Sequence, residues 1–186
     1  MQLMTIVGIA GVSAYGVMQY IGFIFVAVFL GYAVGSAPII GYNFGAQNEN
    51  ELKNVFKKSL FISTLAGCVM TLIAVVFARP LSSIFVGDNP ALLDMTTKGM
   101  RLYSLCFLGC GVNIFASAFF TALSNGGISL LLSFFRLFLC QAICVFLLPV
   151  FWGLNGIWLS ATFAELITLI LTFLTFAWQK GKYHYA

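Results

Sequence analysis

The sequence predicts an all-α, polytopic integral membrane protein, a bundle of about five transmembrane helices. Hydrophobic residues make up 61% of its 186 residues and charged residues only 8%, whereas soluble domains have roughly half and a quarter. The mean hydropathy of +1.03 indicates the same class. Several apolar runs reach the roughly 20 residues that a membrane-spanning helix needs. Because the hydrocarbon core offers no hydrogen-bond partner to the backbone, we expect these runs to be helices.

The apolar runs divide the chain into a short lead and one helical lobe. Residues 1–14 are apolar but too short to cross a membrane, and we interpret them as the end of a helix whose beginning is missing. Residues 15–186 then form the lobe. Its expected spans are 15–40, 59–78, 102–123, 128–151 and 156–178.

Turn signals separate these spans. The sequence SNGG at 124–127 leaves only four residues between the third and fourth spans, which predicts an antiparallel hairpin. WGLN at 152–155 predicts the same reversal between the fourth and fifth. In the longest break, Asp88-Asn89-Pro90 predicts a helix start, with a capping side chain followed by proline in the first turn.

The distribution of Lys and Arg predicts the orientation. One side receives five cations: Lys53, Lys57, Lys58, Lys180 and Lys182. The other side receives Arg79, Lys98 and Arg101. Because cytoplasmic loops carry the excess of positive charge, we expect the C-terminus in the cytoplasm and the N-terminus outside.

Composition also excludes several function classes. The net charge of +4 comes from scattered residues, so we expect no nucleic-acid partner. Cys106/Cys110 and Cys140/Cys144 each share a helix face, but the only histidine is His184, so these cysteines indicate helix packing rather than a metal site. No catalytic triad, carboxylate pair or phosphate-binding loop is found, so we expect neither an enzyme nor a cofactor.

The stretch PIIGYNFGAQNENELKNVFKK, residues 38–58, ends the first apolar run abruptly. No charged residue precedes Glu49, and residues 49–58 contain two acids and three lysines. Structurally, the glycines permit a turn at the membrane face and the lysines hold it there. The stretch also resembles the cytoplasmic signature after the eighth helix of multidrug and toxic compound extrusion (MATE) transporters. The matching residues are Gly41, Tyr42, Asn43, Phe44, Gly45 and Ala46.

Further stretches resemble this family in the same order. RPLSSIF is similar to the end of its ninth helix, GVNIFASAFFTALSNGGISLLLSFFR to its tenth helix and the start of the eleventh, and GLNGIWLSATFAELIT to the start of the twelfth. The chain departs from the family at Thr121, where glutamine is frequent, and at Thr162, where proline is common.

The resemblance implies a C-terminal lobe. MATE transporters consist of two six-helix bundles, and this chain corresponds to the last five helices, so we expect it not to transport without the N-terminal lobe. The implied function is Na⁺- or H⁺-coupled antiport of small organic cations across the cell membrane. One alternative is a non-transporting membrane scaffold or assembly subunit. Another is a flippase of lipid-linked sugars, which would be expected to carry more basic residues toward the cavity than Arg136 alone.

Two polar residues within the spans are the candidates for cation coupling. Glu165 lies about ten residues into its span, near the membrane midplane at about 1.5 Å per residue. An ionised carboxylate there costs about 2.5–3.5 kcal/mol, so it must be protonated, paired or in contact with water. Asn113, in the middle of the third span, is the second candidate; it could coordinate a cation or only join helices.

Other polar and small residues receive weaker expectations. Arg136 is expected to extend to the cytoplasmic interface rather than to pair with Glu165, because the two lie at different depths. The spacing of Gly31 and Gly35 permits a close helix approach. The following residues are expected to line the same cavity as Glu165: Tyr32, Ser36, Ser117 and Thr121.

Overall fold

The structure, a computed structural model, describes residues 2–183 and 185, and its regular elements are all helices. The α-helices are α1 (Gln2–Gly45), α2 (Glu49–Val76), α3 (Ala78–Val86), α4 (Pro90–Tyr103), α5 (Phe107–Ala122), α6 (Gly126–Phe134) and α7 (Gln141–Tyr183). A short 3₁₀ segment, η1 (Ser104–Cys106), joins α4 to α5, and a π-helical segment, η2 (Phe135–Cys140), joins α6 to α7. The predicted all-α class is confirmed.

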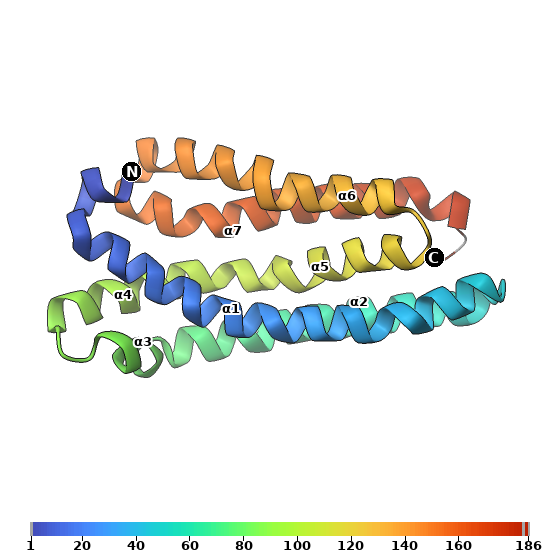
Figure 1. Ribbon diagram of the computed structural model, residues 1–186, viewed down its shortest axis with the longest axis horizontal. Coiled ribbons are helices and arrows are strands. Elements are labelled where there is room, and N and C mark those ends of the chain that lie inside the picture. The colour runs from blue at the N-terminus through green and yellow to red at the C-terminus, as the bar shows by residue number, and fades with distance from the viewer. Residues whose placement is uncertain (1, 184, 186) are drawn as a thin grey trace.

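The helices form an elongated bundle with α5 at its centre. Figure 1 shows α1 and α2 side by side along one edge and α6 and α7 along the other, with α5 between them. Helix α5 contacts all four of these neighbours. Its buried face is accordingly almost continuous from Phe107 to Phe120.

Two glycines break the long helices. Gly153 (φ 53°, ψ −129°) lies within α7, and the chain reverses there, as WGLN predicts. Within the described residues, four helical stretches have the length and hydropathy to cross a membrane: Gly8–Gly45, Glu49–Val76, Pro90–Ala122 and Gly126–Tyr183. The last includes the reversal and provides two passes. The other break, at Gly8 (φ 67°, ψ −155°), separates a short lead from the rest of α1, earlier than the predicted residue 14.

Asparagine side chains cap three of the helices. Asn89 Oδ1 accepts a hydrogen bond from the Leu92 amide at 3.1 Å, which confirms the predicted start of α4 at Pro90. Asn48 caps α2 in the same way and Asn125 caps α6. Helix α2 therefore begins ten residues before the apolar run at 59–78, because its first turns are polar and held by a cap rather than by hydropathy.

The two groups of cations lie at opposite ends of the bundle. The end with the C-terminus and the α1–α2 turn carries Lys53, Lys57, Lys58, Lys180 and Lys182. Arg79, Lys98 and Arg101 belong to α3 and α4, at the other end (Figure 1). The bundle thus has one more basic end and one less basic end.

An aromatic cluster closes the more basic end. Tyr185 is fully buried, and its ring lies 4.8 Å from that of Phe56 and 5.0 Å from that of Phe119, between ring centroids. Its hydroxyl donates to the Phe176 carbonyl at 2.8 Å. Burial raises the pKa of the Tyr185 phenol, so it stays neutral in this contact. Several of the 20 phenylalanines therefore serve as core packing.

Glycines allow α2 to pack closely against α5. They are not Gly31 and Gly35, the pair whose spacing indicated a close helix approach. A Cβ added at Gly67 would lie 2.7 Å from the Phe107 carbonyl oxygen, and one at Gly111 would lie 2.9 Å from the Ser63 carbonyl oxygen. At Gly31 and Gly35, by contrast, a Cβ would meet no atom within 4 Å. The prediction of a close approach at these two was wrong within the described chain, because they lie on the exposed face of α1.

Gly67→Ala is expected to destabilise the bundle by about 1–3 kcal/mol, since the added methyl must push two helix backbones apart. Alanine otherwise favours a helix by roughly 0.5–1 kcal/mol over glycine. Gly31→Ala, the matched control, should therefore leave the thermal unfolding temperature in detergent unchanged or raise it. Equal unfolding temperatures for the two variants would contradict the close contact at Gly67.

Candidate functional site

A buried ion pair joins the fourth and fifth passes of the chain. The Arg136 Nε donates to both carboxylate oxygens of Glu165, at 2.8 and 3.1 Å, and Nη2 lies 2.8 Å from Oε1. The two side chains are only 16% and 13% exposed. The expectation that Arg136 extends to the interface was wrong. An arginine side chain is long enough to cover the difference in depth, and a buried carboxylate is the stronger attraction.

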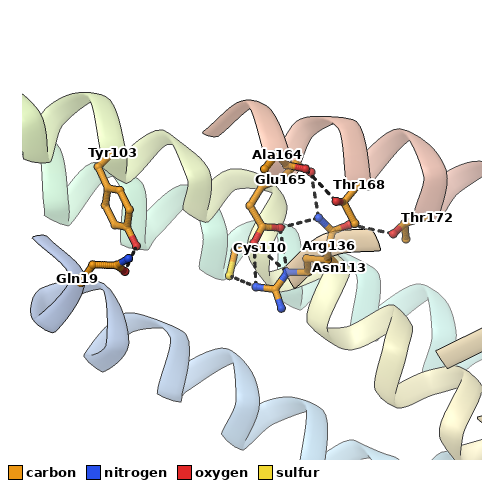
Figure 2. A network of polar contacts seen from close by, with 9 residues as sticks. All are labelled: Gln19, Tyr103, Cys110, Asn113, Arg136, Ala164, Glu165, Thr168 and Thr172. Atoms are coloured by element: carbon orange, nitrogen blue, oxygen red, sulfur yellow. Dashed lines mark hydrogen bonds and ion pairs between the residues drawn. The ribbon is translucent and has the colours of Figure 1, made fainter. Parts of the chain in front are cut away.

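Asn113 of α5 holds the same carboxylate from the other side, as Figure 2 shows. Its Nδ2 donates to Glu165 Oε2 at 2.7 Å and to the Glu165 carbonyl at 3.0 Å. Its Oδ1 accepts from the Thr172 hydroxyl at 2.9 Å, which fixes the amide with its donor group toward Glu165. The structure therefore brings the two sequence candidates, Glu165 and Asn113, into direct contact.

The sequence did not lead us to expect two further members of this network. Cys110 Sγ accepts from Arg136 Nη2 at 3.1 Å, in addition to the packing role expected of it. Thr172 lies two helical turns after Glu165 and thus on the same face of α7, a spacing that could have identified it. These contacts extend the site along α5 and α7.

A cavity of about 190 Å³ opens beside the ion pair. Both charged side chains line it, so the pair is accessible from this space. On the opposite wall, the Tyr103 hydroxyl donates to Gln19 Oε1 at 3.1 Å, and Gln19 Nε2 donates to the Tyr15 hydroxyl at 3.1 Å. The cavity therefore combines one neutralised carboxylate with phenol and amide groups that can accept hydrogen bonds.

Comparison with known families decides what kind of protein carries this site. Residues 1–147 match the MatE family model. The chain belongs to the MatE family. It is a family of transporters rather than enzymes, and its members are multi-pass membrane proteins, so the resemblance to MATE transporters is confirmed.

Solved structures share the fold of this MatE chain. An outward-facing conformation of a multidrug resistance MATE family transporter of the MOP superfamily aligns over 100% of the chain and 42% of its own length, with a TM-score of 0.91 and 18% identity. An inward-facing conformation aligns over 98% and 42%, also at a TM-score of 0.91 and 18% identity. A MOP superfamily transporter from Pyrococcus furiosus, described as having a binding pocket of reverse polarity, aligns over 96% and 40% at a TM-score of 0.87 and 19% identity. No curated protein matches the chain.

This MatE chain thus spans about two fifths of the length of the transporters that it matches. The alignments cover almost all of the chain and less than half of each transporter. The chain is therefore consistent with one lobe of a two-lobed protein.

Residues 41–46, which resemble the MATE signature, lie away from the ion pair. They form the end of α1 and the start of the turn to α2, where Asn43 and Phe44 border a cavity of about 330 Å³ with Glu49, Lys182 and Tyr183. Phe44 and Tyr183 also contact each other, with ring centroids 5.8 Å apart. Here the signature joins the α1–α2 turn to the end of α7.

The four other polar candidates do not line the cavity beside Glu165. Tyr32 donates to Ser59 at 3.0 Å, and it borders a separate cavity of about 270 Å³ together with Ser36. Ser117 and Thr121 belong to a hydroxyl cluster that joins α5 to α6 through Ser129. The expectation of one shared cavity was wrong, because these residues face different neighbouring helices.

The described residues contain no group of three or more His, Cys, Asp or Glu that could hold a metal ion. His184 lies outside the described residues.

Glu165→Ala is expected to destabilise the chain by about 3 kcal/mol, because it leaves the Arg136 charge buried without its partner. The double variant Arg136→Met/Glu165→Met should regain most of this loss, since it removes both charges. The measurement is thermal unfolding of the purified chain in detergent.

The matched control is the exposed pair Arg79–Asp94, 3.3 Å apart and more than half exposed on both sides. Asp94→Ala should cost less than about 1 kcal/mol. A Glu165→Ala loss no larger than that of Asp94→Ala, or a double variant as unstable as the single one, would contradict a tightly coupled buried pair.

Proposed function

We propose that this chain is the C-terminal lobe of a cation-coupled exporter of small organic cations, and that Na⁺ or H⁺ binds at Glu165 and Asn113. The observation that carries the proposal is the buried carboxylate of Glu165, held by Asn113 and open to a cavity in the membrane bundle. A carboxylate at this depth is costly and marks ion pathways. Membership of a transporter family supports the same function.

The arrangement of ligands supports cation exchange. Carboxylate and carbonyl oxygens are suitable ligands for a hard cation such as Na⁺, and a carboxylate equally accepts a proton. The Glu165 carboxylate and the carbonyl oxygen of the same residue both accept hydrogen bonds from Asn113 Nδ2, so Asn113 holds the two kinds of oxygen ligand close together on α7. No resident cofactor is needed for this chemistry.

Coverage of about two fifths of each matched transporter supports a partial chain. Transporters of this kind bind substrate between two repeats and alternate access by moving one against the other. We therefore propose that this chain needs an N-terminal lobe as its partner, with membrane lipid around both. The exposed Gly31 and Gly35 on α1 leave a smooth helix face that such a partner could cover; a non-transporting scaffold would use the same face.

A polypeptide that contains both lobes is expected to expel a fluorescent organic cation from proteoliposomes when an opposing Na⁺ or H⁺ gradient is imposed. Glu165→Gln should abolish the gradient-driven part, because it removes the charge that binds the ion. Asp94→Asn, which neutralises an exposed acid, is the matched control.

Three outcomes of this assay would contradict parts of the proposal or favour its alternative. Gradient-driven efflux that survives in Glu165→Gln would exclude the coupling role. Efflux by the 186-residue chain alone would exclude the need for a second lobe. The non-transporting scaffold would be favoured if the two-lobed protein folds and cross-links to partner helices but transports no cation.

The C-terminus is expected in the cytoplasm, because the more basic end of the bundle carries it. In bacterial cells, a green fluorescent protein fused after Ala186 should fluoresce, and alkaline phosphatase fused at the same point should be inactive. The reverse pair of results would show that the C-terminus faces outward.

A further inference from the structure

We propose that Arg136 is a built-in competitor for the coupling cation: it occupies the Glu165 carboxylate in the ion-free state and leaves when the cation binds. This inference rests on the proposed function and deepens it. It explains what determines the affinity of Glu165 for the coupling cation and why a second cation is excluded.

The contacts of Glu165 leave no free position for another cation while Arg136 is in place. Both carboxylate oxygens accept from Arg136, and Oε2 also accepts from Asn113. Both partners lie within 3.1 Å, so the negative charge is already compensated. An added cation must therefore replace the guanidinium rather than join it.

The backbone that carries Arg136 provides a way to move it. Arg136 is the second residue of η2, which is π-helical, with one residue more per turn than the flanking α-helices. Such segments concentrate at functional sites, and when one shifts along its helix, the residues that it passes rotate by about 100°, the angle of one residue in an α-helix. That rotation would turn the guanidinium away from Glu165 without breaking the rest of α6 or α7.

The cavity beside the pair can receive the displaced guanidinium. It measures about 190 Å³ and is lined by Gln19, Tyr103 and Gln141 in addition to the pair itself. Amide and phenol oxygens accept hydrogen bonds from a guanidinium. Arg136 can thus keep polar partners in both positions.

The net charge of the site then allows only one added cation to bind at a time. With Arg136 on Glu165 the site is neutral; with a monovalent cation on Glu165 and Arg136 in the cavity it carries one positive charge. A second cation in the same cavity is repelled in the loaded state only. A coupling ion and a cationic substrate would therefore bind alternately, which is the requirement for antiport.

The test is binding of radioactive Na⁺ to the 186-residue chain in lipid nanodiscs, with choline chloride to keep the ionic strength constant. Arg136→Gln is expected to raise the Na⁺ affinity about tenfold or more, since removal of a neighbouring opposite charge frees the carboxylate. Arg136→Lys, which keeps the charge but loses the two-pronged contact, should give a smaller gain in Na⁺ affinity. It replaces Arg136→Gln in the test if that variant does not fold. Arg79→Gln, which removes a guanidinium from an exposed pair, is the matched control and should change nothing.

A proton arm distinguishes the two possible ions. If the ion is H⁺, the infrared band of a protonated carboxyl should be stronger in Arg136→Gln than in the parent chain at the same pH, and absent from Arg136→Gln/Glu165→Gln. Arg136 variants that gain in neither arm would overturn the inference, as would an equal gain in Arg79→Gln. If Glu165→Gln loses ion binding and Arg136→Gln gains no affinity, only the competitor role of Arg136 is overturned. If ion binding survives in Glu165→Gln, the proposed site itself is overturned.

Discussion

A charged group within the hydrocarbon core requires an opposite charge and polar partners beside it, and in this chain that requirement ties three segments together. Glu165 of α7 receives Arg136 from η2 and Asn113 from α5, and Thr172 fixes the amide of Asn113. Because α5 also contacts α1 and α2, the central helix carries the position of this network to the rest of the bundle. Hydroxyl contacts such as Ser117–Ser129 and Tyr32–Ser59 join other helices, but only this network pairs opposite charges between passes of the described chain, and it specifies one register between these helices.

Most of the fold could be predicted from composition and turn residues. Apolar runs located the passes, since a bilayer permits only backbone that satisfies its own hydrogen bonds. Asn89-Pro90 and Gly153 marked a helix start and a reversal where the structure has them. Helix ends were less predictable: α2 starts ten residues before its apolar run, because capping rather than hydropathy sets that boundary. The glycine contacts were unpredictable from spacing alone, because spacing does not tell which face of α1 or α2 meets a neighbour.

The site was predictable only in part. Glu165 and Asn113 stood out as polar residues deep in apolar spans, and they are in contact. Arg136 was assigned to the interface, because residue counting placed it at a different depth and could not show that η2 is π-helical. Tyr32 and Thr121 illustrate a similar limit: a polar residue in a span can bond to a neighbouring helix without facing the ion site. Helix rotation, which decides this, depends on the whole bundle.

The ion pair also constrains how the chain enters the membrane during synthesis. Arg136 and Glu165 are 29 residues apart, on passes joined by the tight reversal at Gly153. Translation delivers Arg136 first, so its pass would have to enter lipid with an unpaired guanidinium if the passes left the insertion machinery one at a time. Release of both passes as a finished hairpin avoids this, because each charge then enters lipid already compensated. The stretch from Gly126 to Tyr183 is therefore best regarded as a single unit of membrane insertion.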